Sequence, residues 1–312
     1  MRIVLLLLLF TGGCANVPHA EQKGPLTAGD YTFTLQHDHR RRSYIVHVPP
    51  GPGPYPVVIN FHGAIGSAKG HKEWTQMDKA ADRHGFIAVY PNGTGTFQTW
   101  NAGACCGYAK RKQVDDVGFT LALLKDLKSK IAVDHQRIYA TGLSNGGMMV
   151  YRLAAEVPEQ FAAVAPVATT LALPRLPLGT PIPILHIHSL DDPRVPFLGR
   201  NDANDPQLNF RPVEWTLAAW RKRDGCPEKA RLGPLKRWEE HTAQKLIWGP
   251  CRHNTEIALW RLKGPGHVWP GGAPNYHPRA LGPSTMVIDA NEEIWAFFSR
   301  FTLPDKNALL QK

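Results

Sequence analysis

A serine stands between glycines in the stretch YATGLSNGGMM, which runs from Tyr139 to Met149. Gly142, Ser144 and Gly146 match the G-x-S-x-G pattern, in which a serine occupies a very tight turn between a strand and a helix. Such a turn strains the serine backbone and pushes its hydroxyl outward, and it needs tiny residues two positions before and after. An idle serine in a glycine-rich turn is the alternative, but the strand-like and helix-like flanks favour a nucleophile.

A serine hydroxyl is a weak nucleophile by itself, so this interpretation requires a histidine as base and a carboxylate that orients it. Behind this kind of turn, the acid and then the histidine follow the serine along the chain. Asp191 and Asp192 follow the apolar run IPILHIHS, at the kind of strand end where catalytic groups gather. His267 lies later, in the loop GPGHVWPGG. Turn carboxylates and an exposed loop histidine are the plain alternatives to a triad.

An oxyanion formed during acyl transfer needs backbone N–H donors. The first expected donor is the N–H of Asn145, which follows the serine at the start of a helix-like segment. The second should come from the loop after the early strand VVINF, in the sequence HGAIGS. There the N–H of Ala64, or that of Ile65, is expected to face the substrate. We expect His62 to support this loop rather than to act as a base.

The elements that position these residues alternate along the chain. Short apolar runs alternate with segments of helical spacing, and this predicts an α/β sandwich with a mostly parallel sheet. The Pro/Gly-rich breaks between these elements are each only a few residues long, and none resembles a linker between domains. We therefore expect a single catalytic domain over residues 30–312. The expected strands are 31–36 and 43–48 (a hairpin), 57–61, 86–92, 137–144, 161–169, 182–189 and 255–264, and the expected helices are 72–84, 115–131, one from 145, 211–225 and 289–301.

The first residues, MRIVLLLLLF, place an arginine before an apolar run that is too short to span a bilayer. This layout is typical of a secretory signal, which we assign to residues 1–13, followed by a flexible spacer over 14–29. TGGC resembles a lipoprotein box, which predicts that Cys14 is lipidated and attaches the protein to a membrane. An ordinary signal peptide cleaved nearby is the alternative. We therefore expect a periplasmic, membrane-anchored or extracellular protein.

Export would permit disulfides. Cys226 and Cys251 flank a polar, strand-like segment, and a bridge between them is the first choice. The adjacent Cys105 and Cys106 are expected either to form a vicinal disulfide or to stay reduced. The chain has no C-x-x-C spacing, and the short motifs HDH and HIH offer only two histidines each, so no metal and no cofactor are expected.

The formal net charge is +10, with an isoelectric point near 9.4. The basic clusters RRR at 40–42 and KRK at 110–112 are not interleaved with aromatic residues, as a nucleic-acid groove would be. We therefore expect no nucleic-acid partner. A weak attraction to anionic cell-wall or membrane surfaces stays open.

Taken together, the motifs FHGAIGSA, WNAGACCG, VDDVGF, GLSNGGMM, HIHSLDDPRVPF and GHVWPGG resemble the esterase family of polyhydroxybutyrate depolymerases, feruloyl esterases and LpqC-like lipoprotein esterases. The resemblance covers most of the chain and implies an α/β-hydrolase fold, with helices on both faces of the sheet. It also implies that Ser144 is the nucleophile and His267 the base, and that the acid is Asp192 rather than Asp191.

The chain continues only briefly beyond its last expected helix, so we expect a small or soluble ester, such as a feruloyl, acetyl or short-chain hydroxyalkanoate ester. Trp100 and Trp269 stand in loops beside motif residues and are expected either to stack on the substrate or to cap the core. A peptidase or thioesterase with the same triad, or a non-catalytic surface-binding lipoprotein on the hydrolase fold, are the alternative functions.

Overall fold

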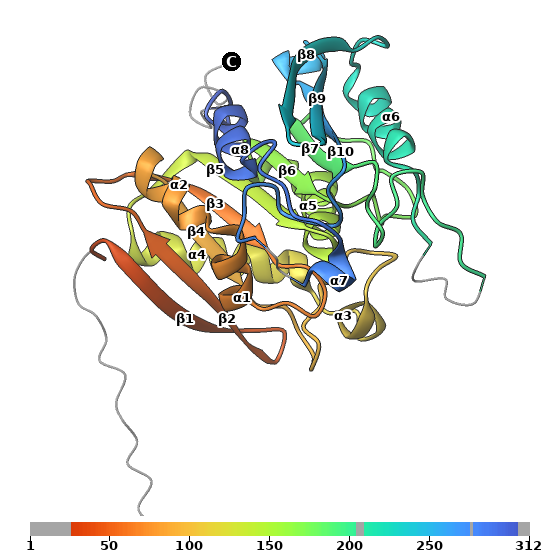
Figure 1. The fold of residues 1–312 in the computed structure, drawn as a ribbon. Coiled ribbons are helices and arrows are strands. Elements are labelled where there is room, and N and C mark those ends of the chain that lie inside the picture. Colours follow the sequence, from red (N-terminus) through yellow and green to blue (C-terminus); the bar gives the residue numbers. More distant parts are fainter. Residues whose placement is uncertain (1–25, 204–208, 275–276, 305–312) are drawn as a thin grey trace, which may run out of the picture.

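The computed structural model describes residues 26–203, 209–274 and 277–304. The predicted signal segment, most of the spacer and Cys14 lie outside the described residues. A ten-stranded sheet forms the centre, with the strand order β1-β2-β4-β3-β5-β6-β7-β10-β9-β8 (Figure 1). The strands are β1 Gly29–His37, β2 Arg40–Val48, β3 Tyr55–Phe61, β4 Ile87–Pro91, β5 Val133–Leu143, β6 Ala163–Val167, β7 Ile184–Ser189, β8 Arg231–Trp238, β9 His241–Trp248 and β10 Ile257–Lys263.

The centre of the sheet is parallel and its two edges are antiparallel. Strands β4, β3, β5, β6, β7 and β10 run parallel to one another. The hairpin β1–β2 pairs antiparallel at one edge, as predicted, and β9 and β8 pair antiparallel at the other. The pair β8–β9 was anticipated only as a polar, strand-like segment, because β8 is largely exposed and carries no continuous apolar run.

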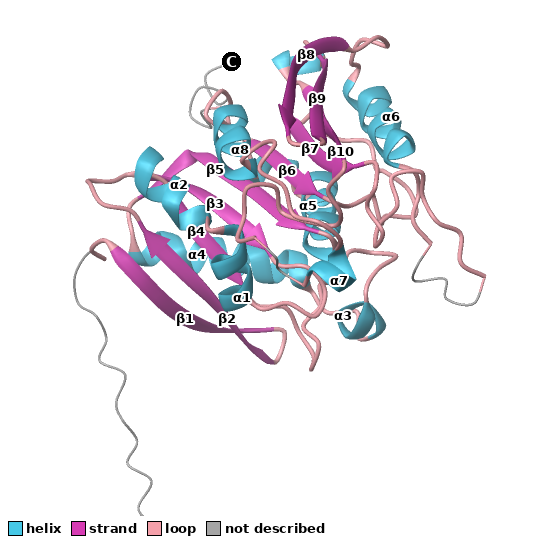
Figure 2. Ribbon diagram, in the orientation of Figure 1, coloured by secondary structure: helices cyan, strands magenta, loops and turns pink. Residues whose placement is uncertain are grey.

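Helices cover both faces of the sheet, as expected (Figures 1 and 2). Apolar side chains of α4, α5 and α6 form one buried cluster with the sheet, and those of α1, α2 and α8 form the other. Short helices α3 and α7 contribute to the cavity described below. The helices are α1 Ala68–Thr75, α2 Met77–His84, α3 Gly107–Arg111, α4 Asp116–Lys130, α5 Asn145–Glu156, α6 Val213–Asp224, α7 Pro278–Leu281 and α8 Ala290–Phe298, with 3-10 turns at Pro158–Gln160 and Arg252–Asn254.

The central strands are apolar on both faces because each face is covered by helices. Along β3, Val57 and Ile59 belong to the first cluster, whereas Val58 between them belongs to the second. Along β5, Ala140 belongs to the first cluster and its neighbour Tyr139 to the second. This alternation of buried residues explains the continuous apolar runs in the sequence.

The single helix predicted over 72–84 is wrong. The structure has two helices that meet at Gln76, whose left-handed backbone (φ 52°) ends α1 and begins α2. The N–H of Gln76 still bonds the carbonyl of Lys72. The change in direction lets Trp74 and Met77 both reach the same core cluster, which helical spacing alone did not reveal. The other predicted helices match the observed ones within three residues.

The predicted bridge between Cys226 and Cys251 is present. It joins the end of α6 to the loop after β9, across 25 residues of sequence. Cys105 and Cys106 also form a disulfide, which settles the alternative left open by the sequence. Over the described residues, every helix is too short or too polar to cross a membrane.

Replacing both Cys226 and Cys251 by serine should lower the free energy of unfolding by about 3 kcal/mol, because the open loop regains entropy in the unfolded chain. Urea unfolding of the wild type and the double variant at pH 7 measures this difference. Equal midpoints for the two proteins would contradict the expectation.

Candidate active site

Ser144 occupies the turn between β5 and α5 with the strained backbone angles φ 57° and ψ −123°. The glycines around it are required by close approach. A Cβ built on Gly142 would lie 2.7 Å from the carbonyl oxygen of Phe61, and one built on Gly146 only 2.2 Å from it. The prediction that both positions tolerate only the smallest residue is therefore confirmed.

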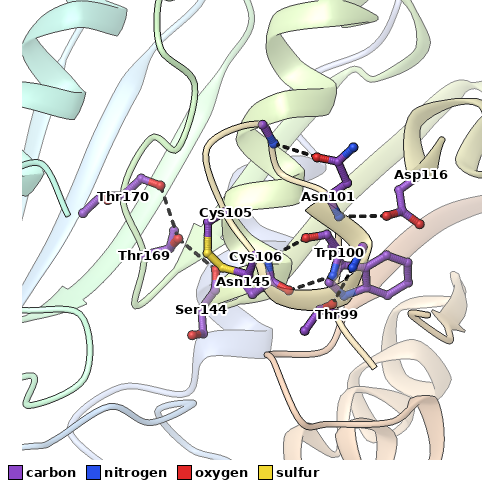
Figure 3. The surroundings of a disulfide bond; sticks show 12 residues. Thr99, Trp100, Asn101, Cys105, Cys106, Asp116, Ser144, Asn145, Thr169 and Thr170 are labelled. Atoms are coloured by element: carbon purple, nitrogen blue, oxygen red, sulfur yellow. Dashed lines mark hydrogen bonds between the residues drawn. A yellow bond between two sulfur atoms is a disulfide. The ribbon is translucent and has the colours of Figure 1, made fainter. Parts of the chain in front are cut away.

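Hydrogen bonds hold this turn from both sides. The Ser144 N–H donates to the carbonyl of Val167 (3.0 Å), and the hydroxyl of Thr169 donates to the Ser144 carbonyl (2.9 Å). The side chain of Asn145 accepts from the N–H of Trp100 (2.8 Å) and donates to its carbonyl (3.0 Å). The serine hydroxyl makes none of these contacts, and in Figure 3 it points away from the bonded groups.

His267 and Asp192 form a buried pair, although they lie 75 residues apart in sequence. The Nδ1 atom of His267 donates to Oδ2 of Asp192 over 2.7 Å, and both residues are 4% exposed. The other carboxylate oxygen accepts the N–H groups of Arg194 and Val195, each over 2.8 Å. Asp191 instead accepts the N–H of Gly264 (2.7 Å). The structure therefore brings Asp192 to the histidine, in agreement with the resemblance.

A third group reaches the Asp192 carboxylate. The Nε2 atom of His188 lies 3.4 Å from Oδ2 of Asp192 and donates to the carbonyl of Val195 over 2.9 Å. Burial alone would raise the pKa of Asp192, but the hydrogen bonds from His188 and His267 outweigh it and hold this pKa well below its usual range. Asp192 is therefore a carboxylate at neutral pH.

His188 is itself held by a buried hydrogen-bonded row. Nδ1 of His188 lies 3.1 Å from Nε2 of His186, and Nδ1 of His186 lies 2.7 Å from the hydroxyl of Tyr151. Burial lowers the pKa of His186, so this ring is neutral and donates from only one of its two nitrogens. The sequence presented HIH as a weak metal motif and as part of the motif HIHSLDDPRVPF. It did not reveal this row, because the partner Tyr151 is far away in sequence.

Ser144 and His267 line the same cavity, whose volume is about 640 Å³. Asn145 and Ala64 line it as well, so the structure gathers four of the predicted site residues around one space. The N–H of Ile65 donates to the carbonyl of Phe97 (2.9 Å), which leaves Ala64 as the better of the two candidate donors.

His62 supports the Ala64 loop, as predicted. Its Nδ1 donates to the carbonyl of Gly63 (2.7 Å), and its Nε2 accepts the N–H of Gly93 (2.9 Å). Burial lowers the pKa of His62 to about 4, so this ring is neutral at pH 7. It has no nitrogen left to serve as a base.

Trp100 and Trp269 do not contact the cavity, and their prediction as substrate-binding residues is wrong. Both are buried, at 0% and 1% exposure. The indole N–H of Trp100 donates to the carbonyl of His62, and that of Trp269 donates to the side chain of Asn291. The alternative interpretation, that both tryptophans complete the core, is the correct one. Their position in loops beside motif residues gave no information on the direction of the side chains.

The disulfide between Cys105 and Cys106 forms part of the cavity wall beside Ser144 and Asn145 (Figure 3). The N–H of Cys106 donates to the carbonyl of Trp100 (3.1 Å), which ties the disulfide to the same segment that Asn145 holds. From the sequence, these cysteines were expected either to bond or to stay reduced and were part of the motif WNAGACCG. Their place in the cavity wall was not predicted.

One group of potential metal ligands occurs among the described residues, and it lies outside the cavity. Asp30, His47 and Asp78 approach one another closely enough to share an ion. The ammonium group of Lys72 already pairs with both aspartates. Both carboxylates of this group therefore have a cationic partner within the protein.

Comparison with known proteins relates the chain to esterases. The family model described as Esterase PHB depolymerase matches residues 42–171. The putative esterase NocK of Nocardia uniformis subsp. tsuyamanensis is 31% identical, over 80% of this chain and 76% of the relative. Feruloyl esterase B of Piromyces equi is 30% identical over 80% of this chain, which spans 42% of that relative. The structure of an acetyl xylan esterase from Aspergillus awamori superposes with a TM-score of 0.57 at 15% identity, over 86% of this chain and 99% of that one.

The sheet, the turn at Ser144 and the structural likeness define an α/β hydrolase. Within this class, the chain belongs to the esterase family that includes the polyhydroxybutyrate depolymerases, as the sequence motifs implied.

Replacing Gly146 by alanine should lower the free energy of unfolding by about 3 kcal/mol, because the new methyl group meets backbone atoms that cannot move aside. Thermal and urea unfolding measure the change. Gly179→Ala is the matched control, since the nearest atom to its new Cβ is 3.9 Å away. Equal losses in the two variants would contradict the proposed close approach.

Lowering the pH should destabilise the protein through three buried histidines. Burial lowers the pKa of His62, His71 and His186, and each returns to its ordinary value near 6.5 on unfolding. The unfolded chain then binds more protons than the folded one, so the free energy of unfolding falls as the pH drops below about 6.5. His47 opposes this: burial alone would lower its pKa, but its hydrogen bonds to aspartates raise it.

The net expectation is an uptake of about two protons on unfolding near pH 6, or about 2.7 kcal/mol per pH unit, which rises toward about three protons near pH 5, where His47 is protonated in both states. Urea unfolding at pH 7, 6 and 5 provides the slope, and His71→Gln should reduce it by about one proton. A free energy of unfolding that stays constant over this range would show that these rings are protonated in the folded protein.

Proposed function

We propose that this protein is an exported serine hydrolase that cleaves carboxylic esters through an acyl-enzyme intermediate. Ser144 is the nucleophile, His267 the base and Asp192 the acid. The observation that carries the proposal is the buried hydrogen bond between His267 and Asp192, at the wall of the same cavity that Ser144 lines.

In the first step, Nε2 of His267 takes the proton of the Ser144 hydroxyl while the oxygen attacks the ester carbonyl. The imidazole becomes positive, and the Asp192 carboxylate stabilises this charge across the Nδ1 hydrogen bond. The histidine then returns the proton to the leaving alcohol. A water molecule repeats the sequence on the acyl-enzyme and releases the acid.

The backbone N–H groups of Asn145 and Ala64 bind the oxyanion in both steps. Asn145 is the first residue of α5, and the N–H at this position has no partner within its own helix. The positive end of the helix dipole lies at the same place. Fixed donors of this kind need no reorientation as charge develops, which is the source of their catalytic effect.

We propose a small or soluble ester as substrate, of the feruloyl, acetyl or short-chain hydroxyalkanoate type. A cavity of about 640 Å³ falls in the usual range for small-molecule sites. Feruloyl and acetylxylan esterases among the relatives support the first two types, and a poly(3-hydroxyalkanoate) depolymerase supports the third. The signal-like first residues and the two disulfides support export, with lipid attachment at Cys14 as the proposed anchor.

Ser144→Ala should lower kcat/KM for 4-nitrophenyl acetate or butyrate by at least about 10⁴-fold, because no other group replaces the nucleophile. Release of 4-nitrophenolate measures the rate. Ser299→Ala, which alters an exposed serine after α8, is the matched control and should keep full activity.

Matched ester, thioester and amide substrates separate the esterase from a thioesterase or peptidase with the same residues. Hydrolysis that survives in Ser144→Ala would refute the role of this serine. A folded wild-type protein that hydrolyses none of these substrates would instead support a binding function.

A further inference from the structure

We propose that the cavity binds ester substrates that carry a carboxylate, and that Arg111 and Arg194 hold this group. The proposal rests on the proposed esterase function and specifies its substrate class. Arg111 ends α3, and Arg194 follows the acid Asp192 by two residues. Both side chains belong to residues that line the same cavity as Ser144 and His267.

The lining of the cavity is basic. Its charged side chains are the two arginines, and it contains no aspartate or glutamate. His62 and His71 also line it, but both rings are uncharged at neutral pH because burial lowers their pKa. A cleft whose charged groups all have the same sign concentrates the electric field, and it attracts ligands of the opposite charge. The chain as a whole adds a formal charge of +10. An anionic substrate is therefore favoured both on approach and in the site.

Neither arginine is neutralised by a partner within the described part of the chain. The backbone N–H of Arg194 bonds Asp192, but its guanidinium has no hydrogen bond or ion pair there, and the same holds for Arg111. Other arginines near the site are engaged: Arg42 pairs with Asp116 over 2.8 Å, and Arg152 pairs with Glu156 over 2.8 Å.

The carboxylates nearest in sequence are committed elsewhere. Asp192 is bonded to His267 and to backbone N–H groups. Asp191 accepts the N–H of Gly264, and Asp115, four residues beyond Arg111, binds His37 and the N–H of Gly118. The two guanidinium groups thus remain available to a ligand.

A carboxylate fits these groups better than a neutral polar group does. The guanidinium presents parallel N–H donors at the spacing of the two carboxylate oxygens, and such charged hydrogen bonds are about twice as strong as neutral ones. The ester carbonyl would lie at Ser144, with the carboxylate of the same molecule at the arginines. The interaction contributes equally to the bound substrate and to its transition state, so it should act mainly on KM.

The test compares pairs of esters that differ in one charge. Monoethyl succinate against ethyl butyrate places the carboxylate on the acyl side, and 4-acetoxybutanoate against butyl acetate places it on the alcohol side. Acid release in a pH-stat gives kcat and KM. For at least one pair, we expect kcat/KM to be about tenfold higher for the anionic member, and we expect this ratio to fall as salt is added.

The double variant Arg111→Gln/Arg194→Gln should reduce this ratio about tenfold, chiefly through KM. Arg41→Gln, an exposed arginine on β2 outside the cavity, is the control and should keep the wild-type ratio. Absence of a preference in the wild type would overturn the proposal. So would a double variant in which both members of a pair fall by the same factor, because that result shows only a structural role.

These results are distinguishable from failure of the proposed function itself. If neither member of any pair is hydrolysed, or if Ser144→Ala hydrolyses them at the wild-type rate, the esterase mechanism fails. If the neutral esters are hydrolysed with dependence on Ser144 but without a charge preference, only the carboxylate site fails.

Discussion

The close approach of β3 to the turn at Ser144 is the constraint on which the rest of the site depends. The carbonyl of Phe61, the last residue of β3, occupies the space that side chains at positions 142 and 146 would need. Because the backbones meet here, the loop after β3 begins beside the nucleophile, and Ala64 reaches the same cavity as Ser144. One contact between backbones therefore places both candidate oxyanion donors relative to the serine.

Asp192 is held in place differently from Ser144. Its carboxylate is positioned by buried hydrogen-bonding groups rather than by close contact between backbones. A buried carboxylate is costly unless hydrogen bonds compensate for lost water. Asp192 receives them from two backbone N–H groups and two histidines. The row from Tyr151 through His186 holds the ring of His188 with its Nε2 facing Asp192.

The sequence was informative where local chemistry restricts residue type. Strained turns demand glycine, and buried parallel strands demand apolar runs, so the turn at Ser144 and the centre of the sheet were predictable. The order of the motifs then indicated His267. Directions of side chains are decided by packing between distant segments, which explains why Trp100 and Trp269 were misjudged and Tyr151 was missed. The break between α1 and α2 at Gln76 was not predicted either, because the helical spacing of apolar residues continues across it.

The segment that precedes α3 in the cavity wall is held by hydrogen bonds to buried groups outside the cavity. The side chain of Asn145 bonds both backbone groups of Trp100, and the next N–H, that of Asn101, donates to Asp116 over 2.8 Å. Asp116 is fully buried and is balanced there by the equally buried Arg42. Because this ion pair holds the segment before α3 against the core, the helix starts from a fixed point.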